Sequence, residues 1–300
     1  MRDVSFKATT RRSATARAVL TADPATITTI KEGRVPKGDP LAVAKVAAVM
    51  AAKKTVDWIP YCHPIPIEFV DVKFELGSDR VTVDVEVVSV AKTGVEMEAM
   101  TAAAAAALNL YDMLKMIDES MEIESITLLE KRGGKSDFQY AEPWRAAVLV
   151  VSDRVSAGTA EDLSGRILVA AAEERGASSV EYAVVSDEPD QIRSAVTKWG
   201  NEGIDLILVT GGTGVSPRDR TPEALENLFD LRLPGIAEAL RRYGQERIPT
   251  SMVSRSVAGV VGQSIVVSLP GSPSACKDAV SVLFPGVLHA RTMLVGGSHG

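Results

Sequence analysis

Cysteine and histidine are scarce in this chain of 300 residues, which contains two cysteines and three histidines. Cys62 and Cys276 lie far apart and form no spacing typical of a metal site. A reduced, cytoplasmic setting is therefore the default prediction. His289 and His299 lie near the end of the chain, so His63 is the histidine with an informative context.

Long apolar runs are also missing. The most apolar window, Ala99 to Leu110, is mainly alanine and is too short and too weakly apolar to cross a membrane. The first residues, M-R-D-V-S-F-K-A-T-T-R-R, lack the apolar core of a signal peptide. We therefore expect no membrane partner.

An excess of positive charge is absent as well. The formal net charge of −6 argues against non-specific binding to nucleic acid, although a local basic pocket is compatible with it. The apolar share of 46% and the charged share of 24% are ordinary for a soluble globular protein. The length is too great for one small core and predicts two domains, which we place at residues 1–140 and 145–300.

The first half has the pattern of a half-buried antiparallel sheet. Val81, Val83, Val85 and Val87 alternate with polar residues, which predicts a strand with one buried face. Further strands are predicted at Val70–Leu76 and Ile123–Glu130, and helices at Leu41–Lys53 and roughly Glu98–Asp118. This order predicts an α+β domain, an antiparallel sheet with helices in a ferredoxin-like arrangement. The alanine run at residues 102–107 is explained by helix formation and close packing.

The second half alternates short apolar runs with helical patterns. The apolar runs are Ala147–Val151, Val180–Val185, Leu206–Val209 and Ile265–Leu269. Such alternation predicts right-handed crossovers and a three-layer α/β domain with a mostly parallel sheet. A short linker is predicted at Asp137–Arg145, where Pro143 and polar residues interrupt both patterns.

The stretch L-I-L-V-T-G-G-T-G-V-S-P-R-D-R-T-P-E, residues 206–223, combines a buried strand, a glycine-rich loop and a helix start. Its glycines, Gly211, Gly212 and Gly214, can adopt positive φ and present backbone N–H groups to a ligand. We expect Thr221 to be the N-cap of the following helix. An ordinary strand–turn–helix connection would explain the pattern too, but Asp219 between two arginines favours a charged ligand.

Polar residues follow all four predicted parallel strands. The segments are S-D-R at 152–154, S-D-E at 186–188, T-G-G-T-G with Asp219, and P-G-S-P-S-A at 270–275. Ligands of open parallel sheets bind beyond the carboxyl ends of the strands. Backbone N–H groups there can hold phosphate, and carboxylates can hold Mg²⁺. For Asp187 or Asp219 taken alone, helix capping would be the simpler interpretation.

The motifs S-D-R-V-S-A-G, T-G-G-T-G-V-S-P-R-D-R-T-P-E and L-P-G-S-P-S-A resemble the molybdopterin adenylyltransferase family, the Mog/MoaB-like domains, from about Arg145 onward. The resemblance implies transfer of AMP from Mg·ATP to the terminal phosphate of molybdopterin, with release of pyrophosphate. It implies Asp187 and Asp219 as catalytic acids that position Mg²⁺ and substrate. The pterin and phosphate pockets would be lined by Asp153, Gly211, Gly212, Thr213, Gly214 and Ser272.

The first half carries its polar residues in scattered places. His63 lies between prolines in an apolar stretch, where a buried, hydrogen-bonded histidine is the usual explanation. Asp112 and Lys115 share one helix face and form either a solvent-exposed salt bridge or a proton-transfer pair. Their apolar neighbours favour a partly enclosed pair. Lys131 and Lys135 flank two glycines and could neutralise a triphosphate or belong to a solvated turn.

Seven ordered segments between Val4 and Phe138 resemble the MoaC family, cyclic pyranopterin monophosphate synthase: V-S-F-K-A-T-T-R-R, V-P-K-G-D, A-A-K-K-T, P-Y-C-H-P-I, K-T-G-V-E-M-E-A, Y-D-M-L-K and G-G-K-S-D-F. The resemblance implies conversion of a cyclic dihydro-GTP intermediate into cyclic pyranopterin monophosphate with loss of pyrophosphate. Asp112 would be a general acid or base, with Lys37, Lys115 and Lys131 around the triphosphate and the reacting ring. The remaining substrate contacts would come from Tyr61, Cys62, His63, Met97, Glu98 and Lys135. Tyr61 stands where the family pattern has leucine.

Together the two halves predict a bifunctional enzyme of molybdenum cofactor synthesis that acts on small molecules. Mg²⁺ with ATP is expected in the second domain, and no tightly bound cofactor in the first. The two families form a hexamer and a trimer respectively, which implies a homo-oligomer based on threefold symmetry. In one alternative, the second domain only binds pterin as a scaffold; in a weaker one, the chain is a GTP-binding regulator. The presence of both Asp187 and Asp219 favours catalysis.

Overall fold

The computed structural model describes residues 1–134, 143–294 and 296. The chain divides into two compact units, Met1–Asp137 and Phe138–Gly300. Most of the linker predicted at residues 137–145 lies outside the described residues. Trp144 and Arg145, at its end, already belong to the first strand of the second unit. No helix among the described residues is long and apolar enough to span a membrane.

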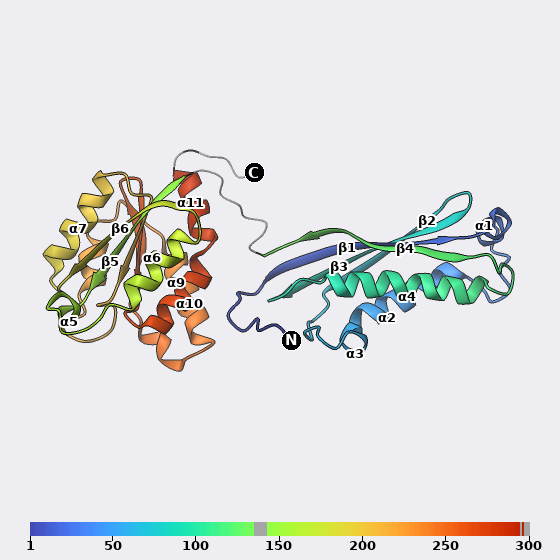
Figure 1. Ribbon diagram of the computed structural model, residues 1–300, viewed down its shortest axis with the longest axis horizontal. Coiled ribbons are helices and arrows are strands. Elements are labelled where there is room, and N and C mark those ends of the chain that lie inside the picture. Colours follow the sequence, from blue (N-terminus) through green and yellow to red (C-terminus); the bar gives the residue numbers. More distant parts are fainter. Residues whose placement is uncertain (135–142, 295, 297–300) are drawn as a thin grey trace. The chain divides into compact units, whose positions relative to one another are not determined.

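The first unit is a four-stranded antiparallel sheet with its two long helices on one face (Figure 1). The sheet order is β2-β3-β1-β4, and the chain order is the βαββαβ order of a ferredoxin-like fold, as predicted. The elements are β1 (Thr10–Thr21), α1 (Pro24–Lys31), α2 (Pro40–Lys53), α3 (Thr55–Trp58), β2 (Phe69–Leu76), β3 (Arg80–Ala91), α4 (Glu96–Leu114) and β4 (Glu122–Arg132).

The core of the first unit is built from valine on β3 and alanine elsewhere. The four alternating valines of β3 are fully buried, as their spacing predicts. Ala14, Ala16 and Ala18 of β1 point into the same core, together with five alanines of α4 at positions 99, 102, 103, 106 and 107. Because alanine is small, α4 can lie close to both the sheet and α2.

Helix α4 ends at Leu114, four residues before the predicted end at Asp118. The carboxylate of Asp118 is largely buried and accepts hydrogen bonds from the backbone N–H groups of Asp23 (2.8 Å) and Ser120 (2.9 Å). The side chain therefore stabilises the turn after the helix rather than extending it.

The second unit is a six-stranded sheet between two layers of helices (Figure 1). Alternate residues of the strand β5 (Trp144–Val151) contribute to two separate cores, with Ala146, Val148 and Val150 in one and Ala147 and Leu149 in the other. The elements are β5 (Trp144–Val151), α5 (Asp153–Ser156), α6 (Ser164–Glu173), β6 (Ala177–Val185), α7 (Pro189–Asn201), β7 (Leu206–Thr210), α8 (Thr221–Glu226), β8 (Leu231–Arg232), α9 (Pro234–Gln245), the 3-10 helix η2 (Pro249–Val253), β9 (Ala258–Val261), β10 (Ser264–Leu269), α10 (Pro273–Leu283) and α11 (Gly286–Leu294).

The strand order is β6-β5-β7-β10-β9-β8. Strands β6, β5, β7 and β10 are parallel, so the predicted mostly parallel sheet is confirmed. Strand β9 pairs antiparallel with β10, and the edge strand β8 pairs antiparallel with β9; neither strand has a counterpart in the sequence prediction. The parallel arrangement brings the carboxyl ends of four strands to one edge of the sheet.

Candidate active sites

The loops after β5 and β6 are joined by a reciprocal pair of hydrogen bonds. The backbone N–H of Asp153 donates to Oδ2 of Asp187 (2.9 Å), and that of Asp187 donates to Oδ1 of Asp153 (3.0 Å). Two predicted site residues therefore lie side by side. Burial raises the pKa of Asp187, whereas the N–H of Asp187 and then the guanidinium of Arg218 lower the pKa of Asp153.

The glycine-rich loop after β7 has left-handed backbone at Gly211 (φ +106°) and Gly212 (φ +61°). A Cβ on Gly211 would lie 2.1 Å from the carbonyl oxygen of Val151. Gly214, by contrast, is not among the positive-φ glycines of the described chain, so that part of the prediction is wrong. A side chain there is excluded by space, because its Cβ would come within 2.9 Å of Oδ2 of Asp219.

Thr221 does not cap helix α8 as predicted. It is the first residue of the helix, and Arg220 occupies the N-cap position without a side-chain hydrogen bond. The Thr221 hydroxyl instead donates to the carbonyl of Gly211 (2.9 Å), and its N–H donates to the carbonyl of Gly212 (3.1 Å). The threonine thus closes the glycine loop onto the helix start.

Asp219 is held in place from two directions. Its Oδ2 accepts a hydrogen bond from the backbone N–H of Ser216 (2.8 Å). Arg255 donates to the carbonyls of Gly214 (2.7 Å) and Asp219 (2.5 Å) and pairs with Glu223. Sequence reasoning missed Arg255, because it follows η2, outside every motif, and no local signal links it to the loop.

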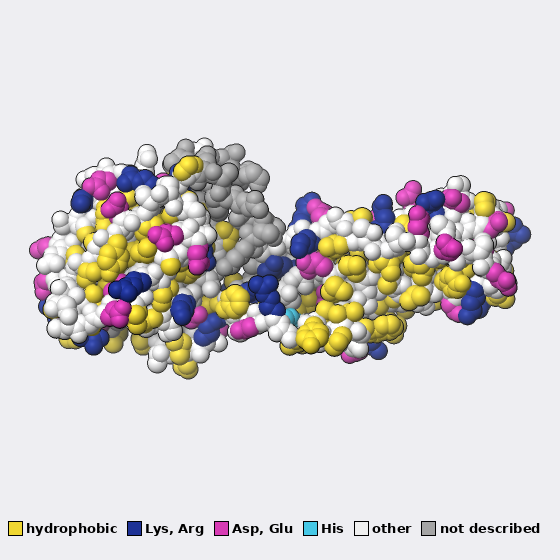
Figure 2. All heavy atoms as spheres, in the orientation of Figure 1, with side chains coloured by type: hydrophobic (Ala, Val, Ile, Leu, Met, Phe, Trp, Pro, Cys, Tyr) yellow, Lys and Arg dark blue, Asp and Glu magenta, His cyan; other side chains and the backbone are white. Residues whose placement is uncertain are grey.

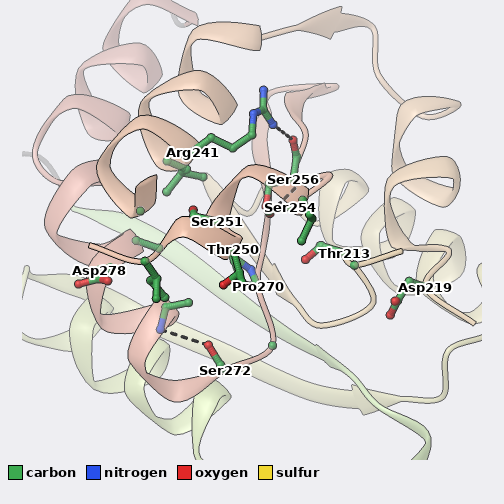
Figure 3. Close-up of a pocket in the computed structure, with 18 of the residues that line it drawn as sticks. Thr213, Asp219, Arg241, Thr250, Ser251, Ser254, Ser256, Pro270, Ser272 and Asp278 are labelled. Carbon is green, nitrogen blue, oxygen red and sulfur yellow. Dashed lines mark hydrogen bonds between the residues drawn. The ribbon is translucent and has the colours of Figure 1, made fainter. Parts of the chain in front are cut away.

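Two cavities meet at this edge of the sheet. The first, of about 400 Å³, has apolar walls from Leu240, Ile248, Val253 and Pro270. Figure 3 shows its polar groups, which come from several elements: Arg241 on α9, Thr250 and Ser251 on η2, Ser254 and Ser256 before β9, and Ser272 and Asp278 at α10. Among the sequence-predicted residues, Gly212, Thr213, Gly214, Asp219 and Ser272 line it.

The second cavity, of about 720 Å³, is strongly acidic. Its lining carries one guanidinium, from Arg154, and the carboxylates of Asp153, Glu161, Asp162, Asp187 and Asp219. Gly212, Asp219 and Gly271 line both cavities, so the two spaces share a wall. Within the described ranges, no cluster of three or more His, Cys, Asp or Glu side chains has metal-binding geometry. A Mg²⁺ ion here would need ligands from a bound phosphate as well.

In the first unit, Asp112 lies between two lysines near the end of α4. Lys115 Nζ is 2.7 Å from Oδ1 of Asp112, and Lys37 Nζ is 3.1 Å from Oδ2. Lys115 first, and then Lys37, hold the pKa of Asp112 below its usual range. The expected enclosure is wrong for the single chain, because the Asp112 side chain is 58% exposed. The apolar neighbours Leu110 and Leu114 point to the opposite face, into the core.

A second group of predicted residues lies at the start of α4. Glu98 is buried, and burial raises the pKa of its carboxyl group. Burial, and then the charge of Glu98, raise the pKa of the Cys62 thiol. A cavity of about 310 Å³ is lined by Glu98, Thr55 and Pro64. His63 is half-buried, and Tyr61 and Met97 are exposed. Lys131 Nζ lies 3.3 Å from Oε1 of Glu96.

These two groups lie at opposite ends of one helix. Glu98 and Asp112 are fourteen residues apart on α4, which at about 1.5 Å per residue corresponds to roughly 21 Å. One chain therefore assembles Lys37, Asp112 and Lys115, and separately Cys62 and Glu98, but does not bring the two groups together. Lys135 lies outside the described residues.

Comparisons with known proteins divide the chain at the same place. Residues 1–134 match the MoaC family, and residues 147–290 match a family described as a probable molybdopterin binding domain. A molybdenum cofactor biosynthesis bifunctional protein of Chlorobaculum tepidum is 44% identical over 299 residues, which cover 100% of this chain and 96% of that protein. A protein of the same name from Synechococcus elongatus is 40% identical over 320 residues, covering 100% of this chain and 99% of that protein.

Each unit also has separate relatives. A cyclic pyranopterin monophosphate synthase of Listeria welshimeri is 51% identical over 143 residues, 47% of this chain and 89% of that protein. The solved structure of the molybdopterin biosynthesis Mog protein from Mycobacterium ulcerans has 39% identity and a TM-score of 0.49, and the match covers 50% of this chain and 99% of that one. The chain therefore belongs to the family of bifunctional molybdenum cofactor biosynthesis proteins, with a MoaC domain followed by a molybdopterin-binding type domain.

Proposed function

We propose that the chain catalyses two reactions of molybdenum cofactor synthesis, one in each unit. The first unit converts a cyclic dihydro-GTP intermediate into cyclic pyranopterin monophosphate and pyrophosphate. The second transfers AMP from Mg·ATP to molybdopterin. The name of the 51%-identical relative supports the first reaction, and the family of the second unit supports a pterin substrate there.

The shared wall of the two cavities carries the proposal for the second unit. We place a flat pterin in the cavity with apolar walls and scattered hydroxyl groups, and a nucleotide in the larger cavity. The terminal phosphate of molybdopterin then meets the α-phosphate of ATP beside Gly212, Asp219 and Gly271. An oxygen of the molybdopterin phosphate attacks the α-phosphorus, the bond from that phosphorus to the bridging oxygen breaks, and pyrophosphate leaves. Such a transfer depends on positioning and charge neutralisation, so no side-chain nucleophile is required.

The excess of carboxylates in the larger cavity fits a nucleotide that arrives with its metal ion. A polyphosphate alone would be repelled by five carboxylates facing one guanidinium. We place Asp187 and Asp219 as the residues that hold Mg²⁺, with Asp153 beside them. When bound, the ion would neutralise the negative charge that develops on the leaving pyrophosphate.

Adenylylation of molybdopterin by wild type and by D219N tests this assignment. We expect ATP-dependent formation of adenylylated molybdopterin with wild type and a loss of at least about 100-fold with D219N, because the metal-holding charge is removed. Pterin binding to both chains is followed by fluorescence as a separate measurement, because Asp219 also lines the cavity that we assign to pterin. A wild-type chain that binds pterin but consumes no ATP would instead establish the scaffold alternative.

For the first unit, we propose that two copies of the chain complete each site. The groups around Asp112 and Glu98 are too far apart to act on one substrate within a chain. Helix α2 presents exposed apolar side chains at Val43, Val46 and Met50, spaced along one face. Figure 2 shows hydrophobic side chains gathered along the helix-covered side of this unit. We infer that a second copy covers this face in an oligomer with threefold-based symmetry.

Complementation between defective chains tests the shared site. K115A and E98Q should each lose turnover of the cyclic dihydro-GTP intermediate. Co-expressed, the two variants should regain up to about a quarter of wild-type activity, because about that share of sites combines Glu98 of a K115A chain with Lys115 of an E98Q chain. A monodisperse monomer in gel filtration, or mixtures no more active than either variant, would refute it.

A further inference from the structure

Arg218 connects the loops that follow three different strands. Its guanidinium donates to both carboxylate oxygens of Asp153, with Nη2 at 2.8 Å from Oδ2 and 3.0 Å from Oδ1. Nη1 donates to Oε1 of Glu188 at 2.9 Å. Arg218 itself lies between Ser216 and Asp219, which both line the acidic cavity. It is therefore a cation at the edge of the proposed nucleotide site, bound to one of that site's own carboxylates.

Breaking these ion pairs costs little free energy. The side chains of Arg218, Asp153 and Glu188 are 56%, 46% and 52% exposed, and ion pairs at such positions contribute little to stability because water screens them. Each carboxylate oxygen of Asp153 already accepts two hydrogen bonds: Oδ1 from Nη2 of Arg218 and the backbone N–H of Asp187, and Oδ2 from Nε and Nη2 of Arg218. A metal ion that takes Asp153 as a ligand would therefore compete directly with Arg218.

The cavity also has fewer cations than a polyphosphate requires. Arg154 is the single cation among its lining residues, against five carboxylates. A guanidinium forms paired hydrogen bonds with phosphate oxygens, which makes it a stronger phosphate ligand than an ammonium group. Arg218, on the exposed loop segment between Gly214 and Thr221, needs only to leave Asp153 to supply such bonds.

We propose that Arg218 is a phosphate-binding residue that leaves Asp153 and binds the phosphate chain when nucleotide arrives. This proposal rests on the proposed function of the second unit. In the free chain it neutralises Asp153 and Glu188. When the nucleotide enters with its metal ion, the carboxylate of Asp153 turns to the ion and Arg218 turns to the phosphate chain. The same residue thus opposes binding of the metal alone and favours binding of the metal with ATP.

Two binding measurements on R218Q separate this role from a structural one. Titration with Mn²⁺ alone, followed by electron paramagnetic resonance, should show binding about two- to fivefold tighter than in wild type, because Asp153 is released from its ion pair. Calorimetric titration with Mg·ATP should show binding weaker by about tenfold or more, because a charge-assisted hydrogen bond to phosphate is lost. R220Q removes the same charge two residues away and should change neither constant by more than about twofold.

The proposal predicts that R218Q binds Mn²⁺ more tightly and Mg·ATP more weakly than wild type, and these opposite changes distinguish it from a structural role. If R218Q weakens both Mn²⁺ and Mg·ATP binding, Arg218 only supports the loop and the proposal is overturned. If Mg·ATP binding is unchanged while wild type still adenylylates molybdopterin, the proposal fails and the proposed function stands. Wild type that binds no Mg·ATP would overturn the proposed function itself. Unchanged pterin fluorescence and thermal unfolding in R218Q would confirm that the variant is folded.

Discussion

At the scale of single residues, Arg255 holds the loop that carries Asp219 without lining the cavity proposed for nucleotide. It binds the carbonyls at both ends of the segment from Gly214 to Asp219, so it sets where the Asp219 carboxylate lies. Reaction rates depend steeply on such placement, because an error of about 1 Å can cost about 100-fold in rate.

R255M should therefore lower kcat for adenylylation by about 100-fold while the KM for pterin changes little. Steady-state kinetics of the second reaction measure both constants. R232M, which removes an exposed arginine paired at 3.7 Å with Glu226, is the matched control and should retain wild-type rates. An equal loss of kcat in both variants would contradict a specific role for Arg255.

Glu98 makes the first unit sensitive to pH through its own ionisation. Burial raises the pKa of its carboxyl group above that of the unfolded chain, so ionisation is less favourable when the chain is folded. The resulting destabilisation is absent below the ordinary pKa of glutamate and is complete once the pH exceeds the raised value. Stability from this group thus falls as pH rises through that window.

E98Q should consequently unfold at a higher temperature than wild type at pH 8, by about 2–4 °C for each kcal/mol recovered. The difference should shrink as the pH is lowered towards the ordinary range of a carboxyl group. Scanning calorimetry at several pH values measures this trend. A difference that grows towards acid pH would show that the carboxylate is stabilised by the fold.

At the scale of elements, the small alanine side chains of α4 allow this helix to pack closely against the sheet and α2. Ala103 is fully buried against its neighbours, whereas Ala104 on the same helix is half-buried. A103L should lower the free energy of unfolding of the first unit by about 1–3 kcal/mol, because a close-packed core has no room for the added atoms. Urea titrations should show a much smaller change for A104L. Equal effects would mean that the helix does not lie tightly against the sheet.

The contrast between apolar and polar residues along a segment decides which elements can be predicted from the sequence. Strand β3 is predictable because its valines alternate with polar residues, whereas β1 buries Ala14, Ala16 and Ala18 among threonine and arginine and shows little contrast. The parallel strands of the second unit are predictable from their apolar runs. Strand β8 has only two residues, Leu231 and Arg232, which is too short for any periodic pattern.

The candidate sites are predictable only where motif and geometry coincide. Asp153, Asp187 and Asp219 follow parallel strands, so their convergence at one sheet edge follows from topology. The far side of the cavity proposed for pterin, with Arg241, Thr250 and Ser254, comes from α9, η2 and the segment before β9, which carry no recognised pattern. In the first unit, the helix predicted over roughly Glu98–Asp118 already implies that Glu98 and Asp112 are separated, whereas the contact of Lys37 with Asp112 joins distant segments and has no signal in the sequence.

At the scale of the whole molecule, each unit encloses its own core and its own candidate residues. The buried clusters of the first unit involve none of the residues that form the cores of the second. We therefore expect each site to be active independently of the other.

D112N should therefore abolish pyranopterin synthesis and leave adenylylation within about twofold of wild type, and D219N should do the reverse. Assaying both reactions on both variants gives the four rates that decide this. A loss of both activities in either variant, with the fold intact, would reveal coupling between the units.

The length of α4 has a numerical consequence for mixed populations of chains. Under the proposed assembly, each copy contributes the first turn of this helix to one site and the last turn to another. A chain carrying both E98Q and D112N would then damage two sites at once. If a fraction f of the chains is intact, the intact fraction of sites falls as f squared, so a minority of defective copies suppresses more activity than its share of the population.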